Sequence, residues 1–169
     1  ASTWLQQYRL DIRFLNLFNI RFIMKLDDVL VMWEADSAID DHHLGESAIA
    51  TAKLHAKYLK ILIDSKLKLT KLNLDYNSMR KLKFRYYRGE MTRDELKDLG
   101  WEQWQYNKPL KTEMDEFLKG DVELSAIQAR VEYMETMVYA LESIMTQIKA
   151  RDWQLSNGIK WKQFLAGNS

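Results

Sequence analysis

Cations and aromatic rings alternate along the run Lys-Leu-Lys-Phe-Arg-Tyr-Tyr-Arg-Gly, which occupies residues 81–89. Lysine and arginine neutralise phosphates, and aromatic rings offer flat faces on which unpaired bases stack. This basic run therefore predicts a site for single-stranded nucleic acid. Its candidate contact residues are Lys81, Lys83, Arg85, Tyr86, Tyr87 and Arg88. The alternative is a solvated basic face whose aromatic rings pack inward.

Two backbone conformations would arrange the basic run differently. In an extended segment, Lys81, Lys83 and Arg85 would share one face because side chains alternate with a period of two. At the end of a helix, the same cations would fan around the last turn. The spacing leaves both conformations open. Neither a helix-turn-helix nor a zinc finger frames the run, which disfavours readout of double-stranded sequence.

Charge is distributed unevenly along the 169 residues, although the whole chain has a net charge of only +1. Residues 53–93 carry a net charge of +9, whereas residues 24–52 carry −6 and residues 94–169 carry −4. The central segment is therefore suited to a polyanion. The acidic segment before it would repel DNA and is suited to a basic protein partner.

The motifs of nucleotide-hydrolysing and cofactor-dependent enzymes are absent from the sequence. There is no phosphate-binding loop, no dinucleotide fingerprint and no cysteine. The metal-like cluster is Asp40-Asp41-His42-His43. Adjacent residues point in different directions, so we expect a solvated loop there, the alternative being the site of a metal-dependent nuclease. We expect a protein that is not an enzyme, with no catalytic residues, no metal and no cofactor.

The scarcity of chain breakers predicts a mainly α fold, because only one proline and six glycines occur. We expect a helix over residues 25–35 and a polar loop over residues 36–45. A long helix begins near Glu46 and either stops before the basic run or continues into it. Gly89, Gly100 and Pro109 mark an irregular region, which also contains Trp101, Trp104 and Tyr106.

The clearest periodicity is a row of apolar residues, here called the heptad seam, whose steps alternate between three and four. The seam comprises Leu124, Ile127, Val131, Met134, Val138, Leu141, Met145 and Ile148. It predicts a long helix with an apolar partner, which is either the core of the same chain or a second subunit. A second row that starts at Tyr133 widens the apolar surface, so the helix should contact more than one neighbour. After Arg151 we expect a change of direction, with Asp152 as a cap and a short final helix.

Residues 1–23 differ from the rest of the chain. Four charged residues interrupt their apolar positions, so they fit neither a membrane span nor a signal peptide. We expect an upstream extension before a usual start at Met24; the alternative is an amphipathic element that docks on a partner or on the core. Residues 24–169 are expected to form a single domain.

The basic run resembles the Leu-Lys-Ala-Arg-x-x-Tyr-Tyr-x-Gly signature of the UvsY family, the recombination mediators of tailed phages. The two signature cations, which contact single-stranded DNA in the family, fall on Lys81 and Lys83. Lys83 stands where the family has arginine, which keeps the charge but loses the planar fork, and Arg85 and Arg88 are additional cations. Further similar segments are residues 24–28, 54–59, 151–153 and 164–167.

The resemblance implies a ring-shaped homo-oligomer of six or seven subunits that binds single-stranded DNA in the cytoplasm of an infected host cell. Such proteins weaken the hold of the single-strand-binding protein and load the RecA-like recombinase UvsX. In this reading the heptad seam joins subunits. The family's β-lined edge would place short strands near Lys81–Tyr87 or Leu110–Lys119. The rival function is a helical interaction scaffold or an assembly chaperone, which would leave the basic run unused.

Overall fold

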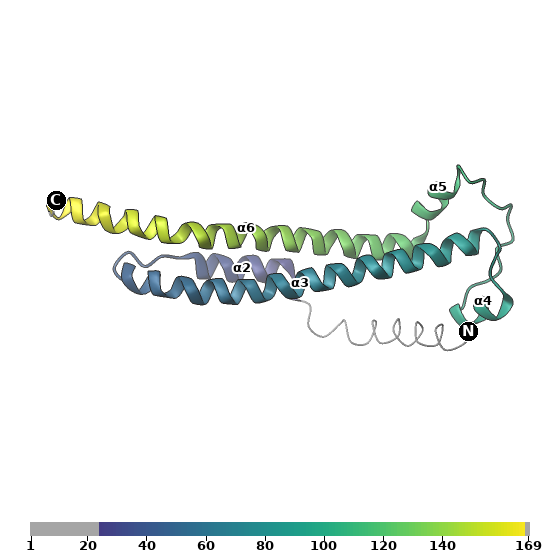
Figure 1. Cartoon of the computed structure of the whole chain (residues 1–169), viewed down its shortest axis with the longest axis horizontal. Helices are drawn as coiled ribbons and strands as arrows, with labels where there is room; N and C mark the ends of the chain where they lie inside the picture. The colour runs from purple at the N-terminus through teal and green to yellow at the C-terminus, as the bar shows by residue number, and fades with distance from the viewer. Residues whose placement is uncertain (1–23, 168–169) are drawn as a thin grey trace. The chain divides into compact units, whose positions relative to one another are not determined.

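The computed structural model describes residues 24–167, so the expectation for residues 1–23 lies outside the described residues. The described chain is mainly helical, as predicted (Figure 1). Its helices are α2 (Leu26–Ser37), α3 (Leu44–Tyr87), α4 (Arg93–Leu99), α5 (Met114–Lys119) and α6 (Val122–Leu165). The polar loop between the first two is short and covers residues 38–43.

The expected short strands are wrong, because residues 24–167 contain no strand. Residues 81–87 are the last turns of α3, and α5 occupies most of the second proposed strand. Apolar spacing explains both helices. Met79 and Leu82 are buried three residues apart, and Met114 and Leu118 are buried four residues apart, so a helix buries each pair on one side.

The chain divides into two compact units, and each long helix contributes to both. The first, here called the α5 unit, comprises Met24 and Leu72–Arg130 of the described residues. The second, here called the α2 unit, combines Lys25–Lys71 with the chain from Val131 onward. The expectation of a single domain over residues 24–169 stays a prediction.

In the α2 unit, α6 contacts both of the other helices. The backbone N–H of Leu26 in α2 donates to the hydroxyl of Tyr133 at 2.8 Å, and Lys66 of α3 pairs with Glu142 at 2.6 Å. The prediction that this helix has more than one neighbour is therefore confirmed. The core of the unit includes Val29, Tyr58, Leu141 and Ile148, each at most 1% exposed.

The heptad seam is buried within the single chain. Seven of its eight side chains are buried, and the eighth, Ile127, packs partly buried against the core of the α5 unit. An apolar partner is thus supplied by the same chain, which is one of the two alternatives left open by the sequence. A role for these residues in joining subunits stays a prediction.

The expected change of direction after Arg151 is wrong, since α6 continues to Leu165. Arg151 is buried, and its guanidinium donates to the carbonyls of Ser37 and Ala38 at 2.8 and 3.0 Å. These carbonyls end α2 and have no partner within their own helix. Leu155 extends the buried row by another turn, and this packing outweighs the cost of about 1 kcal/mol for Gly158 inside the helix.

None of the described helices combines the length and the apolarity that crossing a bilayer requires.

Candidate nucleic-acid interface

The basic run forms the C-terminal turns of α3, so its cations fan around a helix end. The helix stops at Tyr87, and Gly89 has a φ of 65°, a left-handed conformation that favours glycine. The backbone N–H of Gly89 donates to the carbonyl of Tyr86 at 2.9 Å, and that of Glu90 donates to the carbonyl of Arg85 at 3.0 Å. The extended alternative is therefore wrong, and the six candidate residues face different surroundings.

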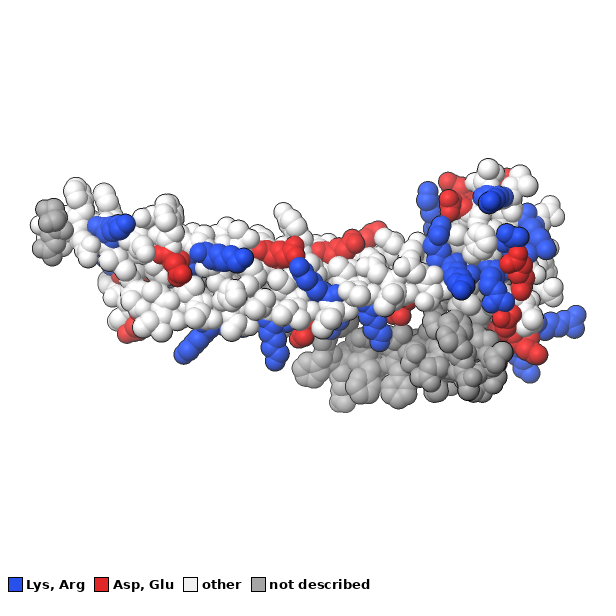
Figure 2. Space-filling model, in the orientation of Figure 1, with Lys and Arg blue, Asp and Glu red and all other residues white. Residues whose placement is uncertain are grey.

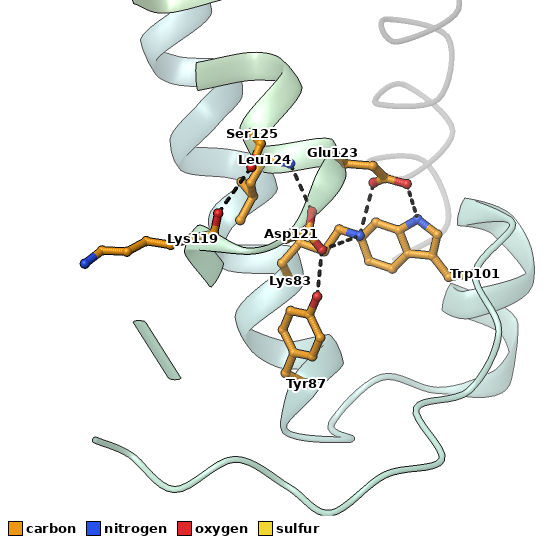
Figure 3. A network of polar contacts seen from close by, with 8 residues as sticks. All are labelled: Lys83, Tyr87, Trp101, Lys119, Asp121, Glu123, Leu124 and Ser125. Carbon is orange, nitrogen blue, oxygen red and sulfur yellow. Dashed lines mark hydrogen bonds and ion pairs between the residues drawn. The ribbon is translucent and has the colours of Figure 1, made fainter. Parts of the chain in front are cut away.

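Lys83 points into the α5 unit, where its side chain is only 8% exposed (Figure 3). Its Nζ lies 3.0 Å from Oδ2 of Asp121 and 3.3 Å from Oε2 of Glu123. The same ammonium sits 4.1 Å from the centroid of the Trp101 ring, an arrangement that stabilises a cation. Trp101 in turn donates its indole N–H to Glu123 at 3.1 Å. Lys83 is thus held by three neighbours and does not face solvent.

Asp121 is the centre of this network and also the residue directly before α6. Its Oδ1 accepts a hydrogen bond from the backbone N–H of Leu124 at 3.0 Å, and this bond caps the helix. Its Oδ2 accepts a hydrogen bond from the hydroxyl of Tyr87 at 2.8 Å and also pairs with Lys83. Burial alone would raise the pKa of Asp121, but the bonds from Leu124, Lys83 and Tyr87 lower it below the ordinary 3.8. The carboxylate is therefore ionised at neutral pH and ties the end of α3 to the start of α6 within the unit.

The two tyrosines of the basic run pack inward rather than outward. Tyr87 is buried, and burial together with the neighbouring Asp121 raises the pKa of its phenol. Tyr86 is partly buried, with its ring centroid 5.3 Å from those of Tyr87 and Trp101. Trp104 lies 4.9 Å from Tyr87 at an interplanar angle of 88°, an edge-to-face contact. The rings thus form the aromatic core of the α5 unit.

Three cations of the basic run remain nearer to solvent. Lys81 is exposed and makes no ion pair with any residue in the described range. The side chain of Arg88 is 50% exposed, and its Nε pairs with Glu90 at 2.7 Å. Arg85 is half-buried, and its Nη2 pairs with Glu95 at 2.9 Å. The accessible charge of the run is therefore carried mainly by Lys81 and Arg88.

Further cations of the α5 unit surround this helix end, interspersed with acids (Figure 2). The exposed lysines among them are Lys97, Lys108, Lys111 and Lys119. The side chain of Lys108 lies over Gly89, where a Cβ would come 3.3 Å from its Cε. Charge counting along the chain missed Lys108, because it stands in an acidic segment and approaches the basic run only through the fold. Gly89 gave part of the signal, since it marks the turn at which the chain leaves α3.

The sequence contained a signal for Asp121 that charge counting did not use. An aspartate directly before a periodic apolar row is a typical helix N-cap. Its position opposite Lys83 depends on contacts between segments 38 residues apart in the sequence, which local patterns do not specify.

The cluster of Asp40, Asp41, His42 and His43 lies in the exposed loop between α2 and α3. Asp40 accepts the backbone N–H of His42 at 2.8 Å and contacts the ring of His43 at 2.7 Å, and these bonds lower its pKa. Throughout residues 24–167, no three metal-ligating side chains gather in one place. The nuclease alternative therefore has no support from the geometry.

Comparison with known families gives a match over residues 32–168 to the family described as "Recombination, repair and ssDNA binding protein UvsY". Solved structures of bacteriophage T4 UvsY, titled a recombination mediator protein, share the fold. Lattice type II gives a TM-score of 0.76 at 19% identity over 85% of this chain and 99% of that one. The lattice type IV structure has a TM-score of 0.70 at 19% identity and covers 83% of this chain and 98% of that one. The lattice type I structure has a TM-score of 0.72 at 18% identity and covers 81% of this chain and 98% of that one. A comparison with curated protein sequences finds no match.

Proposed function

This chain belongs to the UvsY family, and we propose that it is a recombination mediator that binds single-stranded DNA and loads a RecA-like recombinase. It would do so on DNA covered by single-strand-binding protein, in an infected host cell. The observation that carries the proposal is Lys81, which is exposed near the end of α3 and makes no ion pair within residues 24–167. Arg88 follows it by two helical turns, and the α5 unit is rich in exposed lysines. Such a surface neutralises phosphates without reading sequence.

The six residues of the basic run have different roles in this proposal. Lys81 and Arg88 contact phosphates. Arg85 contacts a phosphate only when its ion pair with Glu95 is broken. Lys83, Tyr86 and Tyr87 instead position the helix end, because their side chains are engaged in the network around Asp121 and in the aromatic core. The work of the mediator needs no catalytic residue.

A homo-oligomer of six or seven subunits would link several weak DNA sites, so that one strand binds them together with a high effective concentration. Besides the heptad seam, which is mostly buried in the chain, apolar side chains that stay exposed are further candidates for subunit contacts. Among the described residues, these include Ile49, Ile63 and Leu67 on α3 and Trp161 on α6.

The acidic face of α2 is our candidate surface for the recombinase. Asp27 and Glu34 are exposed there, next to exposed Leu30 and Val31. Acids beside apolar side chains suit a basic protein partner better than DNA. Asp28 is less suitable, since it accepts the backbone N–H of Lys25 and so caps the helix.

The DNA site is tested by the double substitution Lys81→Ala and Arg88→Ala. We expect weaker binding to an oligodeoxythymidylate, because two phosphate contacts are lost in each subunit. The slope of log affinity against log salt concentration should flatten by up to ~1.4 per bound subunit, at ~0.7 per contact. Fluorescence anisotropy over a range of salt concentrations measures both quantities.

Lys149→Ala is the matched control, because Lys149 is an exposed lysine of α6 in the α2 unit. It should leave the slope unchanged. The double variant could instead bind with the wild-type affinity and salt slope while its melting temperature is also unchanged. That result would show that Lys81 and Arg88 do not contact the DNA. A wild-type protein that fails to bind at low salt would favour the scaffold function instead.

A further inference from the structure

We propose that Tyr106, backed by Trp104, is a stacking platform for an unpaired base of single-stranded DNA, an inference that rests on the proposed function. Tyr106 is 75% exposed in the segment between α4 and α5, although tyrosine is usually at least partly covered. Its ring centroid lies 4.9 Å from that of Trp104, at an interplanar angle of 59°. Proteins bind unpaired bases by stacking them on accessible aromatic rings, and Trp104 holds the ring of Tyr106 in place.

Trp104 fixes the platform to the α5 unit. Its indole N–H donates to the carbonyl of Asn107 at 3.3 Å, and its ring contacts Tyr86, Tyr87 and Phe117 edge to face. The tryptophan is thus positioned from both sides. Because its partner ring is already placed, Tyr106 would lose little conformational freedom when a base binds, which favours affinity.

A shallow depression of about 340 Å³ adjoins this platform, a volume at the low end of the range of small-ligand sites. Its lining consists of Tyr87, Trp104, Glu116, Phe117 and Gly120. Aromatic walls suit a planar base, whereas the carboxylate of Glu116 would repel a phosphate. The depression therefore favours the base and not the backbone of the nucleic acid.

A cation for an adjoining phosphate, Lys108, lies two residues further along the chain. Lys108 is exposed, and its Nζ would be 3.7 Å from a Cβ at Gly89, which follows Arg88 directly. Lys108 is thus close both to the platform, two residues away in the sequence, and to Gly89 at the end of the basic run. A strand whose phosphates contact Lys108 and Arg88 would bring a base within reach of Tyr106. Neither tyrosine of the basic run presents an exposed ring like that of Tyr106, since Tyr87, although it lines the depression, is buried and Tyr86 is partly buried.

The platform is tested by Tyr106→Ala, with Tyr106→Phe and Tyr139→Ala as matched controls. Tyr139 is 74% exposed on α6 in the α2 unit, so its removal matches the loss of an exposed ring. We expect Tyr106→Ala to weaken binding to oligodeoxythymidylate roughly five- to 150-fold with an unchanged salt slope, because stacking involves no counterion release. Tyr106→Phe, which keeps the ring, and Tyr139→Ala should bind like the wild type.

An abasic oligonucleotide of the same length separates stacking from phosphate contact. The wild type and Tyr106→Ala should bind it equally, because only the bases have been removed. A Tyr106→Ala penalty that persists on the abasic strand, or no penalty on oligodeoxythymidylate, overturns the platform. If the Lys81 and Arg88 variant still weakens binding in that case, the proposed function stands without the platform. If the wild type binds neither strand at low salt, the proposed function fails and the platform fails with it.

Discussion

Asp121→Ala is expected to lower the free energy of unfolding by about 3 to 5 kcal/mol, the range for removing one partner of a buried ion pair. The substitution leaves the Lys83 ammonium buried, with the half-exposed Glu123 at 3.3 Å as its remaining anionic partner among the described residues. It also removes the cap on Leu124 N–H and the acceptor of the Tyr87 hydroxyl. Urea unfolding followed by circular dichroism measures the change.

The exposed pair of Arg80 and Asp115 provides the matched control within the same unit. Its side chains are 48% and 71% exposed at a separation of 2.9 Å, so Asp115→Ala should cost less than about 1 kcal/mol. The loss of stability in Asp121→Asn should lie between those of Asp121→Ala and Asp115→Ala, since an amide oxygen can still cap the helix. An Asp121→Ala variant as stable as Asp115→Ala would show that the network contributes little to stability.

The same network predicts how stability depends on pH. The pKa of Asp121 is lowered in the folded state, so its contribution is fully present above the ordinary carboxyl pKa of 3.8. That contribution is lost as the pH falls through the lower, folded value. The difference in stability between the wild type and Asp121→Asn should therefore be constant near pH 7 and shrink below about pH 4.

Val138→Asp is expected to lower the free energy of unfolding by about 3 kcal/mol or more, because it places a carboxylate among apolar side chains without a partner. Val138 is buried in the α2 unit, one turn from Met134 and close to Leu141 on the same face of α6. The helix would lose packing as well as gain an unpaired charge. Thermal unfolding by circular dichroism and light scattering on the same samples measure stability and mass.

Tyr139→Asp is the control, because Tyr139 is exposed and adjacent to Val138 on the same helix. It adds the same charge but should change stability by less than about 0.5 kcal/mol, as is usual for surface substitutions. If Val138→Asp instead melts like the wild type and only reduces the mass in solution, the heptad seam joins subunits and is not primarily part of the intrachain core.

Much of the helical architecture could be predicted from the sequence, because it depends on local spacing. The heptad seam predicted a long helix, and the lack of breakers in residues 46–87 allowed α3 to continue into the basic run. The end of α6 could not be predicted in this way. Asn157 and Gly158 are poor helix formers, but Arg151 and Leu155 hold the helix through contacts with other parts of the α2 unit.

The candidate site was predictable only in part, since charge reveals where cations occur and not which of them are free. Lys81 and Lys83 are equivalent in the sequence pattern, yet Lys81 is exposed and Lys83 is paired with Asp121. The pairing depends on tertiary packing. Joint replacement of both lysines would therefore mix a loss of phosphate contact with a loss of stability, which is why Arg88 replaces Lys83 in the proposed binding test.

The most direct test of the central claim measures recombinase loading on a long single strand that is covered by single-strand-binding protein. With a RecA-like recombinase and ATP, the wild-type protein should shorten the lag before recombinase-dependent ATP hydrolysis. The Lys81→Ala and Arg88→Ala variant should restore most of that lag, while Lys149→Ala should behave like the wild type. If the wild-type protein binds the bare strand but leaves the lag unchanged at every concentration, the chain is a single-strand-binding protein and not a recombination mediator.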